Sequence, residues 1–188
     1  LYLGAIDSYM SLQLVQPNGI VSMNGAPATT LGIIRNANPD LKWEVKRTFN
    51  IGMDATFWDR RIALSVDFYT SRTSDMLYQY TVSVPPFTYD VLLANLGKMR
   101  NHGLEIGFGI TPLRRDDMEL NINMNWAFER NKLVTLNGYY NGQYLTAPES
   151  KGISDLYGAG MHGGSNVVQQ VVGQPLGVFV LAHCEGLE

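Results

Sequence analysis

The stretch Met118–Glu129, MELNINMNWAFE, decides the fold class of this chain. Every second residue in it is apolar, and the residues between are polar, charged or small; the apolar set is Met118, Leu120, Ile122, Met124, Trp126 and Phe128. Successive side chains of a β-strand point to opposite faces, so this order puts the whole apolar set on one face. A helix would scatter the same residues around its circumference. The stretch therefore predicts a long strand with one dry and one wet face.

The same alternation recurs in three other segments. Phe49–Phe57 and Ile62–Tyr69 each alternate apolar residues with polar or small ones, and only Trp58–Arg61 separates them. Two alternating runs joined by so short a connection predict an antiparallel hairpin. Leu104–Ile110 is a third such run, and a polar connection leads from it to the first stretch. Because proline cannot donate a ladder hydrogen bond, we expect Pro112 to lie in that turn.

Other segments carry weaker patterns. Extended structure is predicted for five of them: Leu12–Val15, Met76–Val84, Val91–Leu96, Val167–Val172 and Gly177–Leu181. Residues 136–166 form a long, glycine-rich polar connection, and connections of this length are often binding loops. The predicted fold class is therefore all-β, an antiparallel meander of long amphipathic strands with tight turns at one end and longer connections at the other.

Composition excludes several classes of protein. With 45% hydrophobic residues among 188, the chain is too apolar for disorder, and its formal net charge of -3 argues against a nucleic-acid partner. Its one cysteine, Cys184, excludes a disulfide framework, and its three histidines lack zinc-site spacing, so we expect no metal and no other cofactor. Prolines, glycines and amides interrupt the charge-free stretches, which excludes a transmembrane helix. No convergent titratable residues predict a catalytic site, so we do not expect an enzyme.

The alternation does not identify what covers the dry face. In a β-sandwich the apolar rows pack on a second sheet, whereas in a membrane barrel they face lipid. Twelve residues at ~3.3 Å each, tilted by about 40°, rise roughly 30 Å, enough to cross an apolar band about 25 Å tall. The length of the run thus favours a barrel, whose lipid-facing residues would be Leu120, Ile122, Met124 and Trp126. A soluble β-sandwich that binds carbohydrate or acts as an adhesive module is the alternative.

An ordered set of short motifs adds a family resemblance. Residues 38–44, NPDLKWE, resemble the NP-x-LKWE segment of the SusC/RagA-like, TonB-dependent outer-membrane transporters. Further similar segments follow in the family's order, at residues 50–54, 61–69, 73–77, 95–105 and 173–177. The chain departs from the family pattern after Glu44, where it has Val45-Lys46-Arg47, at His102, and at Phe179–His183.

The resemblance implies a large TonB-dependent barrel, of which residues 1–188 are expected to form a single partial segment. Residues 37–135 hold most of the motifs, residues 136–166 would be an extracellular loop, and residues 187–188 are either native or the remnant of a cloning site. The implied function is part of the barrel wall of a bacterial outer-membrane nutrient transporter importing oligosaccharides or peptides. The implied partners are a SusD-like lipoprotein, TonB (through plug parts that we do not recognise in this chain), the ligand and outer-membrane lipid.

Tyrosines gather in the long connection. Tyr139, Tyr140, Tyr144 and Tyr157 all fall within residues 136–166. A tyrosine offers an apolar ring for stacking on a sugar and a hydroxyl for a hydrogen bond. We therefore expect these four residues to contact an oligosaccharide or the partner lipoprotein, and the alternative is an aromatic girdle or a cluster that packs the loop.

Overall fold

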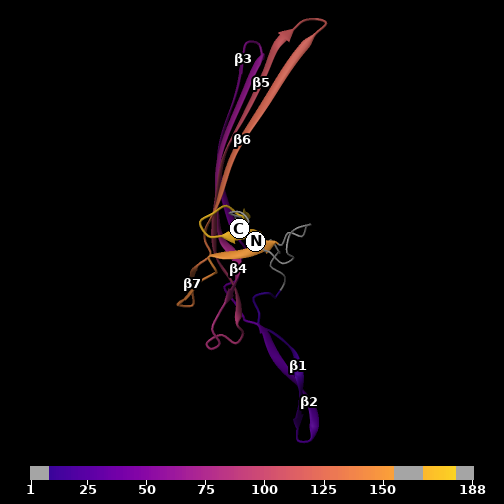
Figure 1. Ribbon diagram of the computed structural model, residues 1–188, viewed down its shortest axis with the longest axis vertical. Coiled ribbons are helices and arrows are strands. Elements are labelled where there is room, and N and C mark those ends of the chain that lie inside the picture. The colour runs from indigo at the N-terminus through magenta and orange to yellow at the C-terminus, as the bar shows by residue number, and fades with distance from the viewer. Residues whose placement is uncertain (1–8, 155–166, 181–188) are drawn as a thin grey trace, which may run out of the picture. The chain divides into compact units, whose positions relative to one another are not determined.

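The computed structural model describes residues 9–154 and 167–180, and in that part of the chain the regular structure is all β (Figure 1). This confirms the predicted fold class. The described residues belong to two compact units. The first contains the described parts of Leu1–Val45, Ser74–Lys98 and Thr135–Glu149, and the second those of Lys46–Thr73, Met99–Val134 and Ser150–Glu188. No helix within the described ranges is long and apolar enough to cross a membrane. Tyr157 and residues 187–188 lie outside these ranges.

The long predicted strands form one four-stranded sheet in the order β3–β4–β5–β6 (Figure 1). The strands contain 13, 20, 24 and 17 residues and are β3 (Val45–Phe57), β4 (Ile62–Thr81), β5 (Val91–Arg114) and β6 (Glu119–Thr135). Such lengths far exceed the five or six residues usual in globular sheets. Among the described residues this sheet does not close on itself, so β3 and β6 remain its outer strands.

Tight turns join β3 to β4 and β5 to β6. At the predicted turn Trp58–Arg61, the Arg61 N–H donates to the Trp58 carbonyl at 3.0 Å. The prediction that Pro112 lies in the second turn was wrong, because β5 continues to Arg114. Thr111 still donates its N–H to the Arg61 carbonyl at 2.7 Å, and Pro112 follows in the last three residues of the strand. Pro112 has no N–H to donate, but because it lies near the end of β5 this absence disrupts little of the hydrogen bonding between the strands.

The first unit begins with a hairpin that the sequence analysis predicted only in part. β1 (Leu14–Met23) pairs antiparallel with β2 (Ala26–Arg35), whereas a strand was expected only at Leu12–Val15. Asn24 and Gly25, with φ of 53° and 81°, form the turn that an Asn-Gly pair favours. Proline and glycine inside β1 hid the strand, because both residues weaken a strand pattern; the structure accommodates them with a shift of register between Pro17 and Gly19.

The long connection contains strands of its own. β7 (Gly138–Tyr140) and β8 (Gln143–Leu145) form a hairpin around Asn141-Gly142, another Asn-Gly turn with positive φ at both residues. Its apolar side chains join the core of the first unit, which also includes residues of β4 and β5; the core residues are Met76, Leu77, Tyr80, Leu92, Ala94, Leu136, Tyr140, Leu145 and Ala147. The described part of the predicted loop is therefore folded, because four of its apolar side chains are buried, those of Leu136, Tyr140, Leu145 and Ala147.

A small three-stranded sheet belongs to the second unit. β10 (Val168–Val171) pairs with β9 (Ser150–Ser154) and with β11 (Val178–Phe179), so the two strands predicted near the C-terminus exist in shortened form. Residues between β10 and β11 bond to β6: the Leu133 N–H donates to the Gln174 carbonyl at 3.0 Å, and the Gly173 N–H to the Leu133 carbonyl at 2.8 Å. The segment Gly173–Gly177, one of the family-like motifs, thus covers part of the outer edge of the long sheet.

Candidate functional site

One face of the four-stranded sheet is apolar and uncovered. The predicted lipid-facing residues of β6 all lie on it with 40–48% of their surface exposed: Leu120, Ile122, Met124 and Trp126. Four apolar residues of β3 are still more exposed: Phe49, Ile51, Met53 and Phe57. A soluble protein rarely exposes so large a contiguous apolar surface. In a β-sandwich a second sheet would bury these side chains, and no described strand does so.

The other face of the sheet is polar. Glycines on it leave space that neighbouring polar side chains fill: Ser65 and Asn125 flank Gly107, and Asn123 lies 2.9 Å from the position of a Cβ at Gly109. Two shallow hollows of about 250 and 200 Å³ open on this face, lined in part by Asp54, Asp67, Glu105 and Asn125. Amides bridge neighbouring strands, as where Asn101 Nδ2 donates to Glu129 Oε1 at 2.9 Å.

The polar face provides hydrogen-bonding groups and negative charge, without a reactive centre. Counting along the strands, the carboxylates of the alternating runs all fall on this face: Asp54, Asp67, Glu105, Glu119 and Glu129. No three His, Cys, Asp or Glu side chains of the described residues come close enough together to hold a metal ion. Such a face suits contact with water and with hydrated solutes, as in the lumen of a barrel.

The NPDLKWE motif holds the ends of the long strands in place. Asn38 is 2% exposed, and its Nδ2 donates to the Leu93 carbonyl of β5 at 2.7 Å. Lys42 forms an ion pair with Asp75 of β4 at 2.9 Å, and the Leu77 N–H donates to Glu44 Oε1 at 3.0 Å. The motif therefore has a structural role that its sequence alone did not reveal. The sequence signal that could have indicated this role was the presence of Asn, Lys and Glu together in a segment outside any strand.

The predicted ligand-binding tyrosines separate into different environments. Tyr139 and Tyr144 are 73% and 52% exposed and are cross-strand partners on β7 and β8, with ring centroids 5.0 Å apart in an edge-to-face arrangement. Tyr140 is only 8% exposed, and its hydroxyl donates to Asn38 Oδ1 at 3.1 Å. Burial also raises the pKa of the Tyr140 hydroxyl. Ring surface for a ligand thus remains at Tyr139 and Tyr144, and Tyr157 is outside the described residues.

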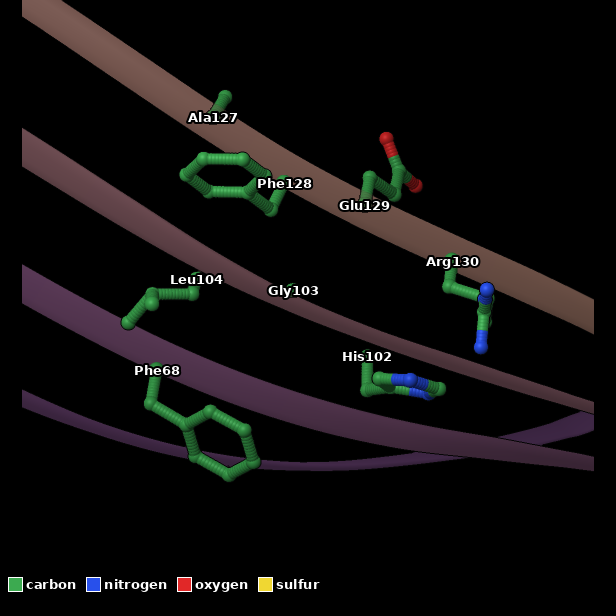
Figure 2. Close-up of a pocket in the computed structure, with 8 residues that line it drawn as sticks. All are labelled: Phe68, His102, Gly103, Leu104, Ala127, Phe128, Glu129 and Arg130. Carbon is green, nitrogen blue, oxygen red and sulfur yellow. The ribbon is translucent and has the colours of Figure 1, made fainter.

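A hollow of about 520 Å³ lies where the apolar face meets basic side chains. Figure 2 shows Phe68 of β4, Leu104 of β5 and Phe128 of β6 next to one another, with His102 and Arg130 beside them. Ala127 and Glu129 point away from this group, to the opposite side of β6. The hollow therefore marks the boundary between apolar and cationic residues on one face.

Long strands that carry one apolar and one polar face define the class as a β-barrel wall. Comparison with known proteins gives the family: the one described as TonB dependent receptor-like, beta-barrel, matches residues 6–168. The chain belongs to this family, which confirms the predicted resemblance. Receptors of this family are not enzymes, in agreement with the sequence analysis.

Individual relatives are much longer than this chain. TonB-dependent receptor P39 of Formosa agariphila is 30% identical over 158 residues, which cover 81% of the chain and 14% of that protein. TonB-dependent receptor SusC of Bacteroides thetaiotaomicron is 28% identical over 114 residues, 61% of the chain and 11% of SusC. A chain in the structure of the RagAB peptide importer in its open-open state superposes with a TM-score of 0.66 at 24% identity, covering 90% of this chain and 16% of that one. This last likeness supports the fold alone.

Proposed function

We propose that the chain is part of the barrel wall of an outer-membrane transporter that imports oligosaccharides or peptides. The main observation in support is the four-stranded sheet. One of its faces is apolar and exposed, and the other is polar and holds the carboxylates of the alternating runs. The first face would contact outer-membrane lipid and the second would line the water-filled lumen. Among the similar proteins, the TonB-dependent receptor SusC supports this class of function, and the RagAB peptide importer supports the fold.

The orientation follows from the lengths of the connections. Outer-membrane barrels place short turns in the periplasm and longer connections outside the cell. The β3–β4 and β5–β6 turns are short, whereas nine residues separate β4 from β5 and β7 and β8 follow β6. The ends of β4, β5 and β6 that these longer connections follow or join would therefore face the exterior, where a SusD-like lipoprotein would deliver ligand. TonB would act through a plug that precedes the barrel in the whole protein.

The exposed tyrosine pair is the proposed contact for ligand or lipoprotein. Replacing Tyr139 and Tyr144 together by Ala in the full-length protein should weaken binding of a transported oligosaccharide or peptide about tenfold, if the two rings contribute ~1.4 kcal/mol. The double Phe variant keeps the rings and separates stacking from hydroxyl bonding. Tyr9→Ala removes an equally exposed tyrosine elsewhere in the same unit and serves as the matched control.

Uptake tests the proposal as a whole. Cells that express the full-length protein should accumulate fluorescent oligosaccharides or peptides only when TonB is present, and the protein should fractionate with the outer membrane. An aqueous, detergent-independent protein would contradict the barrel, and uptake that persists without TonB would contradict the transport mechanism. Unchanged binding in the Tyr139/Tyr144 double Ala variant would remove only the tyrosine contact.

A further inference from the structure

Four cations lie side by side across the long sheet. The contacts of Gly103 with Tyr69, and of Gly107 with Ser65 and Asn125, fix which residues of β4, β5 and β6 are neighbours. Counting outward from these contacts places Arg72, Arg100 and Lys132 in one row. The contact of Gly52 with Asp67 adds Arg47 of β3 to the same row. We call Arg47, Arg72, Arg100 and Lys132 the cation row.

The cation row continues the apolar face. Arg72 is exposed, whereas its strand neighbours Ser71 and Thr73, which point to the opposite face, are 3% and 9% exposed. The next row toward the tight turns contains His102 and Arg130, and the row after it contains Phe68, Leu104 and Phe128, as Figure 2 shows. Cationic side chains thus follow directly after the apolar rows, on the side of the longer connections.

Within the described part of the chain, no member of the cation row forms an ion pair. By the same counting, the carboxylates of the alternating runs point to the polar face. Lys42 pairs with Asp75 and Arg114 with Glu119, and neither ion pair includes a member of the row. Like charges directly opposite one another on neighbouring strands destabilise a sheet. An anionic partner from outside the sheet would relieve this repulsion.

The depth of the cation row matches a membrane surface. Met124 is the middle residue of the apolar set Leu120–Phe128 on β6, and Lys132 follows it by eight residues. Eight residues at ~3.3 Å, tilted by about 40°, rise roughly 20 Å. If Met124 lies near the midplane, this distance places the row in the headgroup layer, since half of a bilayer with its headgroups is about 20–22 Å.

We propose that the cation row binds the phosphate groups of membrane lipids in the leaflet on the side of the longer connections. The proposal rests on the proposed function, because it needs the apolar face to be in lipid. Arg and Lys stems would lie along the acyl chains while their charged ends reach the phosphates. Arg in particular matches phosphate oxygens with paired hydrogen bonds. The hollow beside His102 and Arg130 would accept the upper part of an acyl chain against Phe68 and Phe128.

Two adjacent residues of β3 provide a matched pair of variants. Arg47 belongs to the cation row, and Lys46 points to the polar face, so Arg47→Gln and Lys46→Gln remove the same charge from opposite faces. The full-length transporter, in uncharged detergent, is titrated with phosphatidylglycerol while its thermal unfolding is followed. Arg47→Gln should lower the apparent lipid affinity about fivefold, because one cation near an anionic surface contributes ~1 kcal/mol to binding. Lys46→Gln should leave the affinity unchanged. The triple variant Arg72→Gln, Arg100→Gln, Lys132→Gln should lower it on the order of a hundredfold.

Two further titrations distinguish binding of an anionic lipid from binding of free phosphate or of a lipid without net charge. Inorganic phosphate and phosphatidylcholine, each added in place of phosphatidylglycerol, should stabilise the parent protein far less. Equal stabilisation by inorganic phosphate, or equal lipid affinity in Arg47→Gln and Lys46→Gln, would overturn the proposal. If the triple variant does not fold, the comparison of Arg47→Gln with Lys46→Gln still tests the proposal. Heat-modifiable mobility of the parent protein on gels tests the barrel separately, so a failed barrel is distinguishable from a barrel that lacks lipid specificity.

Discussion

Arginine at Met124 should destabilise the full-length barrel by about 2–4 kcal/mol, the cost of a cation at the midplane of an outer-membrane barrel. Met124 is the central residue of the exposed apolar set Leu120–Phe128, whose two ends are eight residue steps apart. At ~3.3 Å per residue and a tilt of about 40°, the set rises roughly 20 Å, so Met124 lies roughly 10 Å from either end. Phe128→Arg, at one end, should therefore cost only about 0–1 kcal/mol.

The assay is the urea dependence of the folded fraction in lipid vesicles, read from the heat-modifiable gel mobility of the barrel. Asn125→Arg is the matched control, because Asn125 is the next residue of β6 and lines the polar face. Its arginine would face water and should cost little. The reasoning is refuted if Met124→Arg and Phe128→Arg cost the same, or if Asn125→Arg is the most destabilising of the three.

Three further outcomes follow from the first unit, each measured on the full-length protein. Asn38→Ala should cost about 1–3 kcal/mol, because it leaves buried partners of its amide unsatisfied, and a double-mutant cycle with Tyr140→Phe should be clearly non-additive. Gly97→Val should cost about 1–3 kcal/mol in the same urea assay, since a Cβ there would lie 2.7 Å from Met76 Cβ. Burial raises the pKa of Tyr80 above the ordinary 10.0, so its contribution to stability should be complete below pH 10 and be lost as the pH rises through the folded-state pKa. Tyrosinate absorbance that appears at the ordinary pKa, before unfolding, would contradict this last expectation.

The long strands could be predicted from sequence because each has one apolar and one polar face. Period-two alternation records that difference directly, so β6 and the β3–β4 turn at Trp58–Arg61 followed from residue order alone. Pro112 misled the prediction, because proline is tolerated near a strand end as well as in a turn. The alternation could not distinguish the wall of a barrel from one sheet of a β-sandwich, and the family match identified the barrel family.

The first unit was harder to predict, because its strands are short or carry turn residues. Asn24-Gly25 and Asn141-Gly142 both formed hairpin turns, and each was a usable signal that lay outside an alternating run. The burial of Tyr140 could not be predicted from its neighbours, since it depends on Asn38, 102 residues away in sequence. Side chains that meet through long-range contacts leave no local pattern.

Labelling residues 118–129 one at a time tests the central claim most directly. Each residue of the full-length protein would be replaced by a spin-labelled cysteine after Cys184→Ser, and collision rates with oxygen and with a water-soluble relaxation agent measured in membranes. The apolar set Met118–Phe128 should favour oxygen at every second position, and the intervening residues should favour the aqueous agent. Uniform accessibility, or aqueous exposure of Ile122, Met124 and Trp126, would contradict a sheet with one face in lipid and the other in water.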